Sequence, residues 1–120
     1  LAGHPVEALD VVEEAIAAFD DYRDHLCAPD LYLFKGEALD RLGAPAEEIE
    51  ACYVAGLTLA RQLGARVSEL RAATRLARFQ QLHGRALEGR KLLQPVVAWF
   101  SEGRDSADLH TAHALLKELV

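Results

Sequence analysis

The sequence is poor in several residue types, and each shortage narrows what the protein can be. Its 120 residues include no methionine, two cysteines and one tryptophan, and serine and threonine together number six. Because the chain begins with Leu1, and an initiator methionine is normally removed only before a small residue, we expect a piece of a longer protein. Any enzymatic activity of that parent would then lie outside residues 1–120, which we interpret as a single domain.

Few residues are suited to catalysis or to metal binding. None of the three serines lies in a nucleophile-elbow pattern, and no glycine-rich phosphate loop follows a strand. Cys27 and Cys52 do not form a metal-type pair, so we interpret them as reduced thiols that pack as small apolar residues. His110 and His113 lie three residues apart but lack a third ligand. We therefore predict no enzyme, no cofactor and no bound metal.

Long apolar runs are also missing. No run approaches the roughly 20 residues that are needed to cross a bilayer, and no signal-peptide pattern opens the chain. We therefore predict a cytoplasmic protein without membrane contact. The net charge of −6 and the separation of the aromatic residues from the basic segment argue against direct binding of nucleic acid.

Alanine and leucine are abundant, which favours helices over strands. Apolar residues recur at helical spacing in six segments, and no segment alternates as a strand would. Asp30 is expected to cap the second helix, and Asp105 or Ser106 the last one. Pro95 predicts a kink or a local break in the fifth helix. We predict helices over residues 5–19, 30–42, 45–63, 66–83, 86–103 and 106–119.

Three stretches of the chain are nearly alike: LAGHPVEALDVV (1–12), LGAPAEEIEACY (42–53) and LHGRALEGRKLL (82–93). Their glycines, Gly3, Gly43 and Gly84, lie 40 and 41 residues apart, each at the predicted turn within a helix pair. Self-similarity at a fixed period of about 20–50 residues indicates stacked helical hairpins that cover one another's apolar faces. The chain would then comprise half a repeat, two full repeats and a C-terminal capping helix.

These repeats resemble the tetratricopeptide repeat, whose pattern has aromatic residues and Leu-Gly on the first helix and Ala and Phe on the second. Tyr32, Gly36 and Leu39 stand at the first-helix positions, and Ile49 and Tyr53 at the second-helix positions. Ile49 replaces the usual alanine, and the period exceeds the common 34 residues by about six or seven, which implies longer helices. The resemblance implies an all-α, right-handed solenoid of about six helices with a concave groove lined by first helices.

The C-terminal stretch LLQPVVAWFSEGRDSADLHTAHALLKEL is similar to the closing block of large bacterial signalling proteins. In those proteins an ATPase core is joined to a nucleotide cyclase or to a DNA-binding regulator. The stretches GEALDRLG and LARQLGARVSELRAATRLA resemble the same region. The resemblance implies a non-catalytic interaction or regulatory scaffold that binds a protein, a peptide or another domain of the same chain.

Charge is unevenly distributed along the chain. Residues 1–60 carry 13 acidic and 3 basic side chains, whereas residues 61–91 carry 8 basic and 2 acidic ones. In the geometry of the resembled repeat, Arg71 and Arg78 face the groove, and one hypothesis is that they bind a carboxylate or phosphate. Arg75 shares their helix face by its spacing, and the other hypothesis is that these three arginines pair with Glu37 and Asp40 or are solvated. The candidate groove residues are Glu37, Asp40, Arg71, Thr74, Arg78 and Gln81, with Asp30, Leu33 and Arg41 facing the same side.

Two other functions stay open at this stage. A closed apolar pocket with a few convergent arginines would favour a sensor that binds a small anionic metabolite between repeats. The first helix lacks its partner helix, so its uncovered apolar flank would be free to pair with a second copy and form a homodimer.

Trp99 and Phe100 are adjacent aromatic residues near the end of the fifth helix. Such a pair can form an interaction hot spot, but we expect it to anchor the closing helix over the last hairpin. On this interpretation, Trp99→Ala costs roughly 3–5 kcal/mol of stability.

Overall fold

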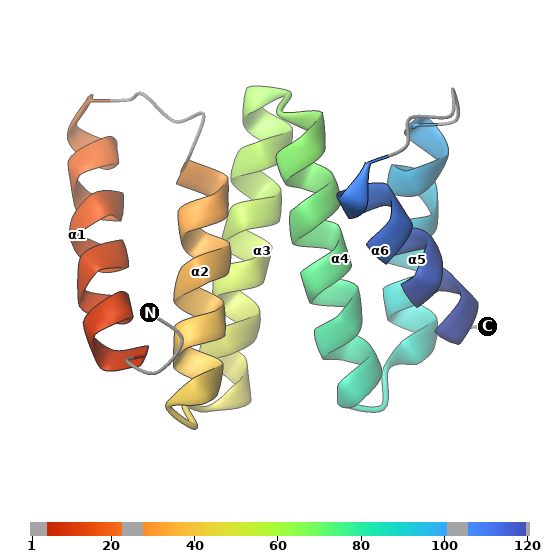
Figure 1. Cartoon of the computed structure of the whole chain (residues 1–120), viewed down its shortest axis with the longest axis horizontal. Coiled ribbons are helices and arrows are strands. Elements are labelled where there is room, and N and C mark those ends of the chain that lie inside the picture. The colour runs from red at the N-terminus through yellow and green to blue at the C-terminus, as the bar shows by residue number, and fades with distance from the viewer. Residues whose placement is uncertain (1–4, 23–27, 101–105, 120) are drawn as a thin grey trace.

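Local sequence chemistry divides the described residues into six α-helices, which Figure 1 shows in order. The structure, a computed structural model, describes residues 5–22, 28–100 and 106–119. The helices are α1 (Pro5–Tyr22), α2 (Ala28–Arg41), α3 (Ala46–Leu63), α4 (Arg66–Leu82), α5 (Ala86–Trp99) and α6 (Ala107–Glu118). No strand occurs in the described ranges. The prediction of an all-helical chain is confirmed.

Glycines end the helices where the sequence predicts. Gly43, Gly64 and Gly84 have φ angles of 74°, 66° and 75°, a left-handed conformation that is strained for other residues. Each lets the chain reverse while a late backbone N–H bonds back to the helix. Ala44 N donates to Leu39 O across 3.0 Å after α2. Gly3, the first of the three repeated glycines, lies outside the described residues.

One of the two predicted helix starts is confirmed and the other is wrong. Ser106 precedes α6, and its side chain accepts a hydrogen bond of 3.2 Å from Leu109 N. Asp30, by contrast, does not cap α2, because α2 begins two residues earlier at Ala28. Pro29 explains the earlier start, since its ring presets a helical φ in a first turn that needs no backbone donor.

Helix α5 also differs from its prediction. It continues through Pro95, so the helix does not break there, and the kink that was the other expected effect of Pro95 stays a prediction. A proline removes one backbone hydrogen bond, to the carbonyl four residues earlier. Lys91 is that residue, and it and Pro95 are both exposed, so water can satisfy the carbonyl. The helix ends at Trp99 with Phe100 as its C-cap, whereas the prediction extended it to Gly103, which lies outside the described residues.

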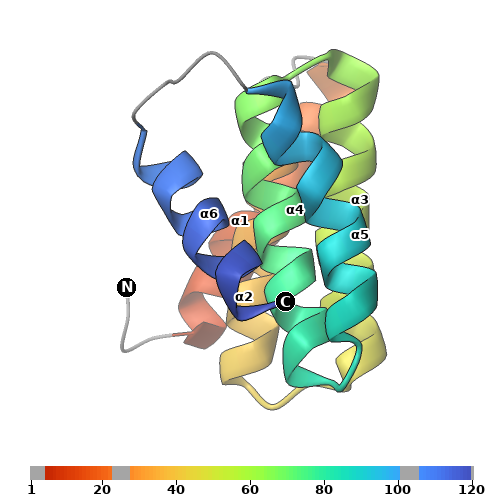
Figure 2. The same ribbon diagram turned by 90° about the vertical axis from the view of Figure 1, so that its right-hand side faces the viewer.

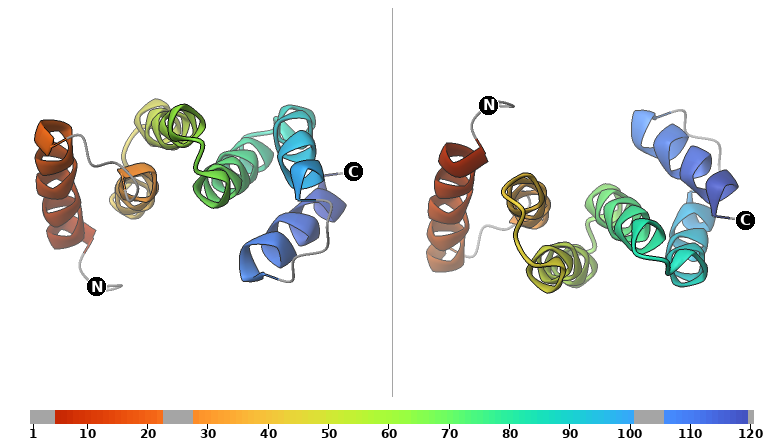
Figure 3. Two further views of the ribbon diagram at one scale, coloured as in Figure 1. Left: turned by 90° about the horizontal axis from the view of Figure 1, so that it is seen from above. Right: turned by 90° about the horizontal axis from the view of Figure 1, so that it is seen from below.

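The helices alternate between two sides of the molecule. Figure 3 shows α2, α4 and α6 on one side and α3 and α5 on the other. Each helix contacts the next along the chain, and α4 also contacts both α2 and α6. Figure 2 shows α6 beside α4, crossing it obliquely. One side is therefore built from three helices, α2, α4 and α6, that are not consecutive in sequence. The molecule measures 36 × 30 × 22 Å.

Close packing between helices depends on glycines that lie inside them. A Cβ atom on Gly36 would come within 2.6 Å of the Tyr53 ring on α3. A Cβ on Gly89 of α5 would lie 2.9 Å from the Ala77 carbonyl oxygen of α4. The core between these helices is dominated by side chains that are less than 2% exposed, among them Leu33, Leu70, Leu93 and Leu115. The glycine–aromatic contact between α2 and α3 fixes where Tyr53 sits in the site described next.

Candidate functional site

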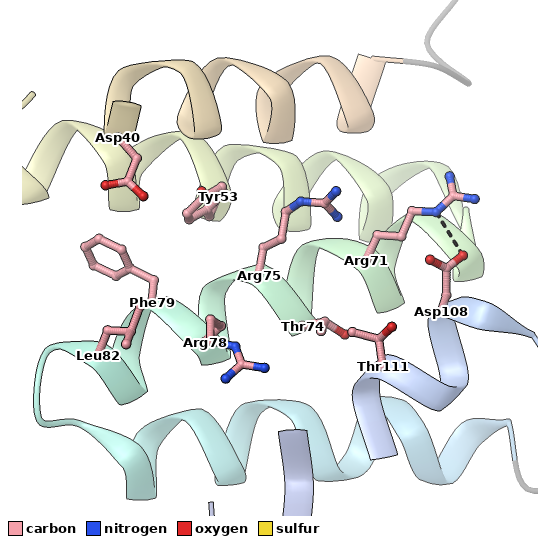
Figure 4. Close-up of a pocket in the computed structure, with 10 residues that line it drawn as sticks. All are labelled: Asp40, Tyr53, Arg71, Thr74, Arg75, Arg78, Phe79, Leu82, Asp108 and Thr111. Atoms are coloured by element: carbon pink, nitrogen blue, oxygen red, sulfur yellow. Dashed lines mark hydrogen bonds and ion pairs between the residues drawn. The ribbon is translucent and has the colours of Figure 1, made fainter. Parts of the chain in front are cut away.

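A hollow in the described structure lies on the side formed by α2, α4 and α6. It has a volume of about 310 Å³ and is shown in Figure 4. We call this hollow and its rim the inner groove. Its lining residues are Asp40 from α2, Tyr53 from α3, Arg71, Thr74, Arg75, Arg78, Phe79 and Leu82 from α4, and Asp108 and Thr111 from α6.

All six candidate groove residues gather on this side of the molecule. Four of them line the hollow directly: Asp40, Arg71, Thr74 and Arg78. Glu37 reaches it through an ion pair with Arg75, and the side-chain oxygen of Gln81 accepts a hydrogen bond of 3.2 Å from Arg78.

Leu33 was expected to face the groove but is only 1% exposed. It belongs to the core cluster instead, because a leucine gains more from burial than from contact with water. Sequence reasoning also missed Asp108 and Thr111, because nothing local reveals that α6 crosses α4.

Arg71 connects three helices. Its guanidinium donates to Asp30 on α2 and to Asp108 on α6, with both donor–acceptor distances at 3.0 Å. Burial disfavours the charged form of Arg71, but the hydrogen bonds and charges of Asp108 and Asp30 outweigh it and raise its pKa. Such charge-assisted bonds hold the guanidinium group in place between α2 and α6. Arg71 is therefore a structural tie as much as a candidate ligand contact.

The other groove arginines are also paired. Arg75 bonds to Glu37, and Arg78 bonds to Glu118 on α6 at 3.1 Å. The hypothesis that arginines pair across the groove thus holds for Glu37, whereas Asp40 makes no ion pair with a described residue. Three arginines face five carboxylates around the inner groove: Asp30, Glu37, Asp40, Asp108 and Glu118.

Tyr53 is the polar group that lies deepest in the groove. It is 6% exposed, and its hydroxyl makes no hydrogen bond with a described residue. Burial, followed by the negative charges of Glu37 and Asp40, raises the pKa of Tyr53 to about 12, although Arg75 opposes the shift. The phenol therefore stays protonated at neutral pH and can both donate and accept one hydrogen bond.

The prediction that Trp99 anchors the last helix is wrong. Trp99 is 55% exposed, with the Arg66 guanidinium carbon 4.4 Å from a ring centroid and Phe100 edge-on at 5.0 Å. Helix α6 is instead held by its own apolar side, where Leu109 and Leu115 are at most 3% exposed. Phe100 packs against the core, so only one of the two aromatic residues has an anchoring position.

Other candidate groups form no chemical site within the described ranges. No set of three or more His, Cys, Asp or Glu residues there could hold a metal ion. His110 and His113 are exposed. Cys52 is a buried free thiol whose pKa is raised by burial, although Lys35 opposes the shift. Cys27 lies outside the described residues.

No family model, curated protein or solved structure matches the chain. The resemblance to tetratricopeptide repeats and to bacterial signalling ATPases therefore stays a prediction. Across the part of the chain that the structure describes, no helix is both long and apolar enough to span a membrane.

Proposed function

We propose that this chain is a non-catalytic protein-interaction module whose helices form a right-handed solenoid of hairpins. Two features support the solenoid. The pairs α2–α3 and α4–α5 are each joined at a glycine with positive φ, Gly43 and Gly84. Gly36 and Tyr53, which stand at positions of the resembled repeat, pack directly against each other.

The observation that carries the functional proposal is the inner groove itself. It runs between non-consecutive helices, and its rim is uneven in both charge and polarity. Leu82 lines it and is 73% exposed, and Phe34 is 48% exposed. Phe34 shares one helix face with Asp30 and Glu37, because residues three and four apart lie together. Protein-binding surfaces combine apolar side chains, aromatic ones above all, with a polar rim, and Phe34 and Leu82 would supply apolar side chains here.

A protein segment fits this groove better than a small anionic metabolite does. An anion would have to displace carboxylates, because Arg71, Arg75 and Arg78 all carry an acidic partner already. A segment with charges of both signs can exchange partners with these ion pairs. Arg78 is the most available, since the side chain of its partner Glu118 is half exposed and exposed pairs contribute little, about 0–1 kcal/mol.

The partner expected from the resemblance is another protein or another domain of the same signalling protein. Binding in the groove would then bias the activity of linked domains, which is a coupling between two sites. The regulatory role rests on resemblance, whereas the binding role rests on the groove.

Selection of a random peptide library on the immobilised chain tests the binding role. Enriched peptides would then be titrated against three proteins by fluorescence anisotropy. These are the unmodified chain, the groove variant Arg71→Ala/Arg78→Ala and the control variant Arg61→Ala/Arg85→Ala. The control also loses two ion-paired arginines, but neither lines the inner groove.

We expect the groove variant to bind about tenfold more weakly or worse, a loss of about 1.4 kcal/mol or more, and the control to bind as the unmodified chain does. Failure to enrich any peptide, or equal binding by all three proteins, would contradict the proposal. Circular dichroism of each variant shows whether it is folded before it is titrated.

A further inference from the structure

Asp40 differs from the other carboxylates of the inner groove. Asp30 and Asp108 are bonded to Arg71, Glu37 to Arg75, and Glu118 to Arg78. Asp40 is exposed, lines the hollow and pairs with no described cation. A carboxylate that forms no ion pair with a described residue can attract a positive group from a ligand.

Two aromatic residues lie beside Asp40. Figure 4 shows Asp40 and Tyr53 on one wall and Phe79 and Leu82 on the facing one. The rings of Tyr53 and Phe79 lie 6.2 Å apart at 68°. Ring faces and a phenolic oxygen both attract cations. We call the end of the groove formed by Asp40, Tyr53, Phe79 and Leu82 the Asp40 subsite.

Tyr53 supplies an independent sign that the Asp40 subsite takes a ligand. The residue as a whole is 6% exposed, and polar groups in such positions normally bond to the protein or to water. Its hydroxyl has no partner among the described residues, but the hydroxyl oxygen is open to solvent. Because Tyr53 lines the hollow, a group entering the hollow can complete its hydrogen bonding.

Arg75 and Arg78, which lie on α4 with Phe79 and Leu82, do not remove the attraction of the Asp40 subsite for a cation. Arg75 is held by Glu37, and Arg78 bonds to both Glu118 and Gln81. The three arginines that line the hollow are thus bonded to four carboxylates, and Asp40 is a fifth carboxylate that lines the hollow without an ion pair to a described residue. The hollow of about 310 Å³ lies at the lower end of the roughly 300–1,000 Å³ usual for small-molecule pockets. It can therefore take one long side chain but not a folded element.

We propose that the Asp40 subsite binds one cationic side chain, a lysine or arginine, of the segment that occupies the inner groove. The proposal rests on the proposed function, because it assumes that a protein segment lies there. It reverses the hypothesis that the groove selects carboxylates or phosphates. The cation would contact the Asp40 carboxylate and the Tyr53 oxygen, while its aliphatic stem would lie against Leu82 and Phe79.

Titration of the folded chain with small probes tests the subsite without any knowledge of the partner. Butylammonium imitates a lysine side chain, butyrate carries the opposite charge on a similar stem, and butanol is neutral. Amide shifts in two-dimensional NMR spectra would be followed at matched ionic strength. We expect butylammonium to shift signals around Asp40, Tyr53 and Leu82, and we expect butyrate and butanol to shift them much less.

Two substitutions with matched controls make the test specific. Asp40→Asn should weaken butylammonium binding about fivefold, the upper range for an exposed ion pair. Asp10→Asn, on an exposed position of α1, should leave it unchanged. Tyr53→Phe should cause a smaller loss, and Tyr32→Phe none. Equal binding by Asp40→Asn and the unmodified chain, or a stronger response to butyrate, would overturn the proposal.

The peptide selection separates failure of the subsite from failure of the proposed function. If the enriched peptides share a basic residue, and replacing that residue weakens binding to the unmodified chain more than binding to Asp40→Asn, the result supports both the subsite and the interaction module. Enriched peptides without a basic residue, bound equally by Asp40→Asn, overturn the subsite and leave the interaction module standing. A chain that responds to butylammonium but enriches no peptide would overturn the proposed function alone.

Discussion

Trp99 and Tyr53 show at the level of single residues how position decides what an aromatic side chain does. Trp99 lies at the last position of α5, where few neighbours cover it, and it stacks with Arg66 at the surface. Tyr53 lies in the middle of α3 and fills the space left by Gly36. The larger residue thus contributes little to the core, and the smaller one contributes much.

This contrast gives a stability prediction for α5. Trp99→Ala should cost about 1 kcal/mol or less, because it removes an exposed ring and one cation–π contact. Leu93→Ala on the same helix should cost about 2–5 kcal/mol, because Leu93 is 0% exposed and its loss leaves a cavity. Urea denaturation of both variants provides the comparison. A loss of about 3 kcal/mol or more in Trp99→Ala, which is the cost of removing a buried tryptophan, would restore the anchoring role.

Side chains whose fate depends on distant helices could not be predicted from the sequence. The charge and helical spacing of Arg71, Arg75 and Arg78 place them together on one face, and that much is local. Their partners are not local: Arg71 bonds to residues 41 positions before it and 37 after it. Asp40 likewise has no ion-pair partner among the described residues because other carboxylates lie against the arginines. Only the packed structure determines which carboxylates these are.

At the level of helices, the ends were predictable where one residue decides them. The glycine ends of α2, α3 and α4 follow from a conformation that few other residues adopt. The start of α2 was misassigned, because Asp30 is a good capping residue but Pro29 is also compatible with a first helical turn. Asp30 is then used by Arg71 in another helix. Local sequence thus allows the helix to begin either at Ala28 or after Asp30, and the contact between Asp30 and Arg71 favours the earlier start.

The turn between α2 and α3 gives a second prediction. Gly43→Ala should destabilise the chain by about 1–2 kcal/mol, the cost of a left-handed conformation for an L-residue. The loss is purely conformational, because a Cβ at Gly43 would meet no atom within 4 Å. Gly43→Asn should recover part of it, since asparagine tolerates this region better. Equal stability of the alanine variant and the unmodified chain in urea would show that the turn is not constrained in this way.

At the level of the whole molecule, α1 lies at one end of the row of helices and has exposed apolar side chains. Val6 and Val11 are 56% and 60% exposed, which agrees with the expected uncovered flank. Acidic side chains surround them, and Glu7, Asp10 and Glu14 share one exposed side by their helical spacing. Pairing of two copies through α1 would therefore bring like charges together.

This arrangement predicts a monomer at low salt. At about 0.01 M salt the screening length is about 30 Å, so repulsion between two α1 helices is nearly unscreened. Light scattering across a range of protein concentrations should give the mass of one chain, 13.2 kDa. A mass that doubles with concentration under these conditions would contradict the prediction and favour the homodimer alternative.

Tyr53 has a further consequence for how such a groove can change its partner. The ring that packs between α2 and α3 belongs to a residue that lines the hollow, so in the proposed subsite one side chain would serve both cohesion and recognition. Replacing Tyr53 would weaken the packing of α2 against α3 and would also change which ligand the subsite prefers. New preferences are therefore most accessible through Asp40 and Leu82, exposed residues that the scaffold can lose without coming apart.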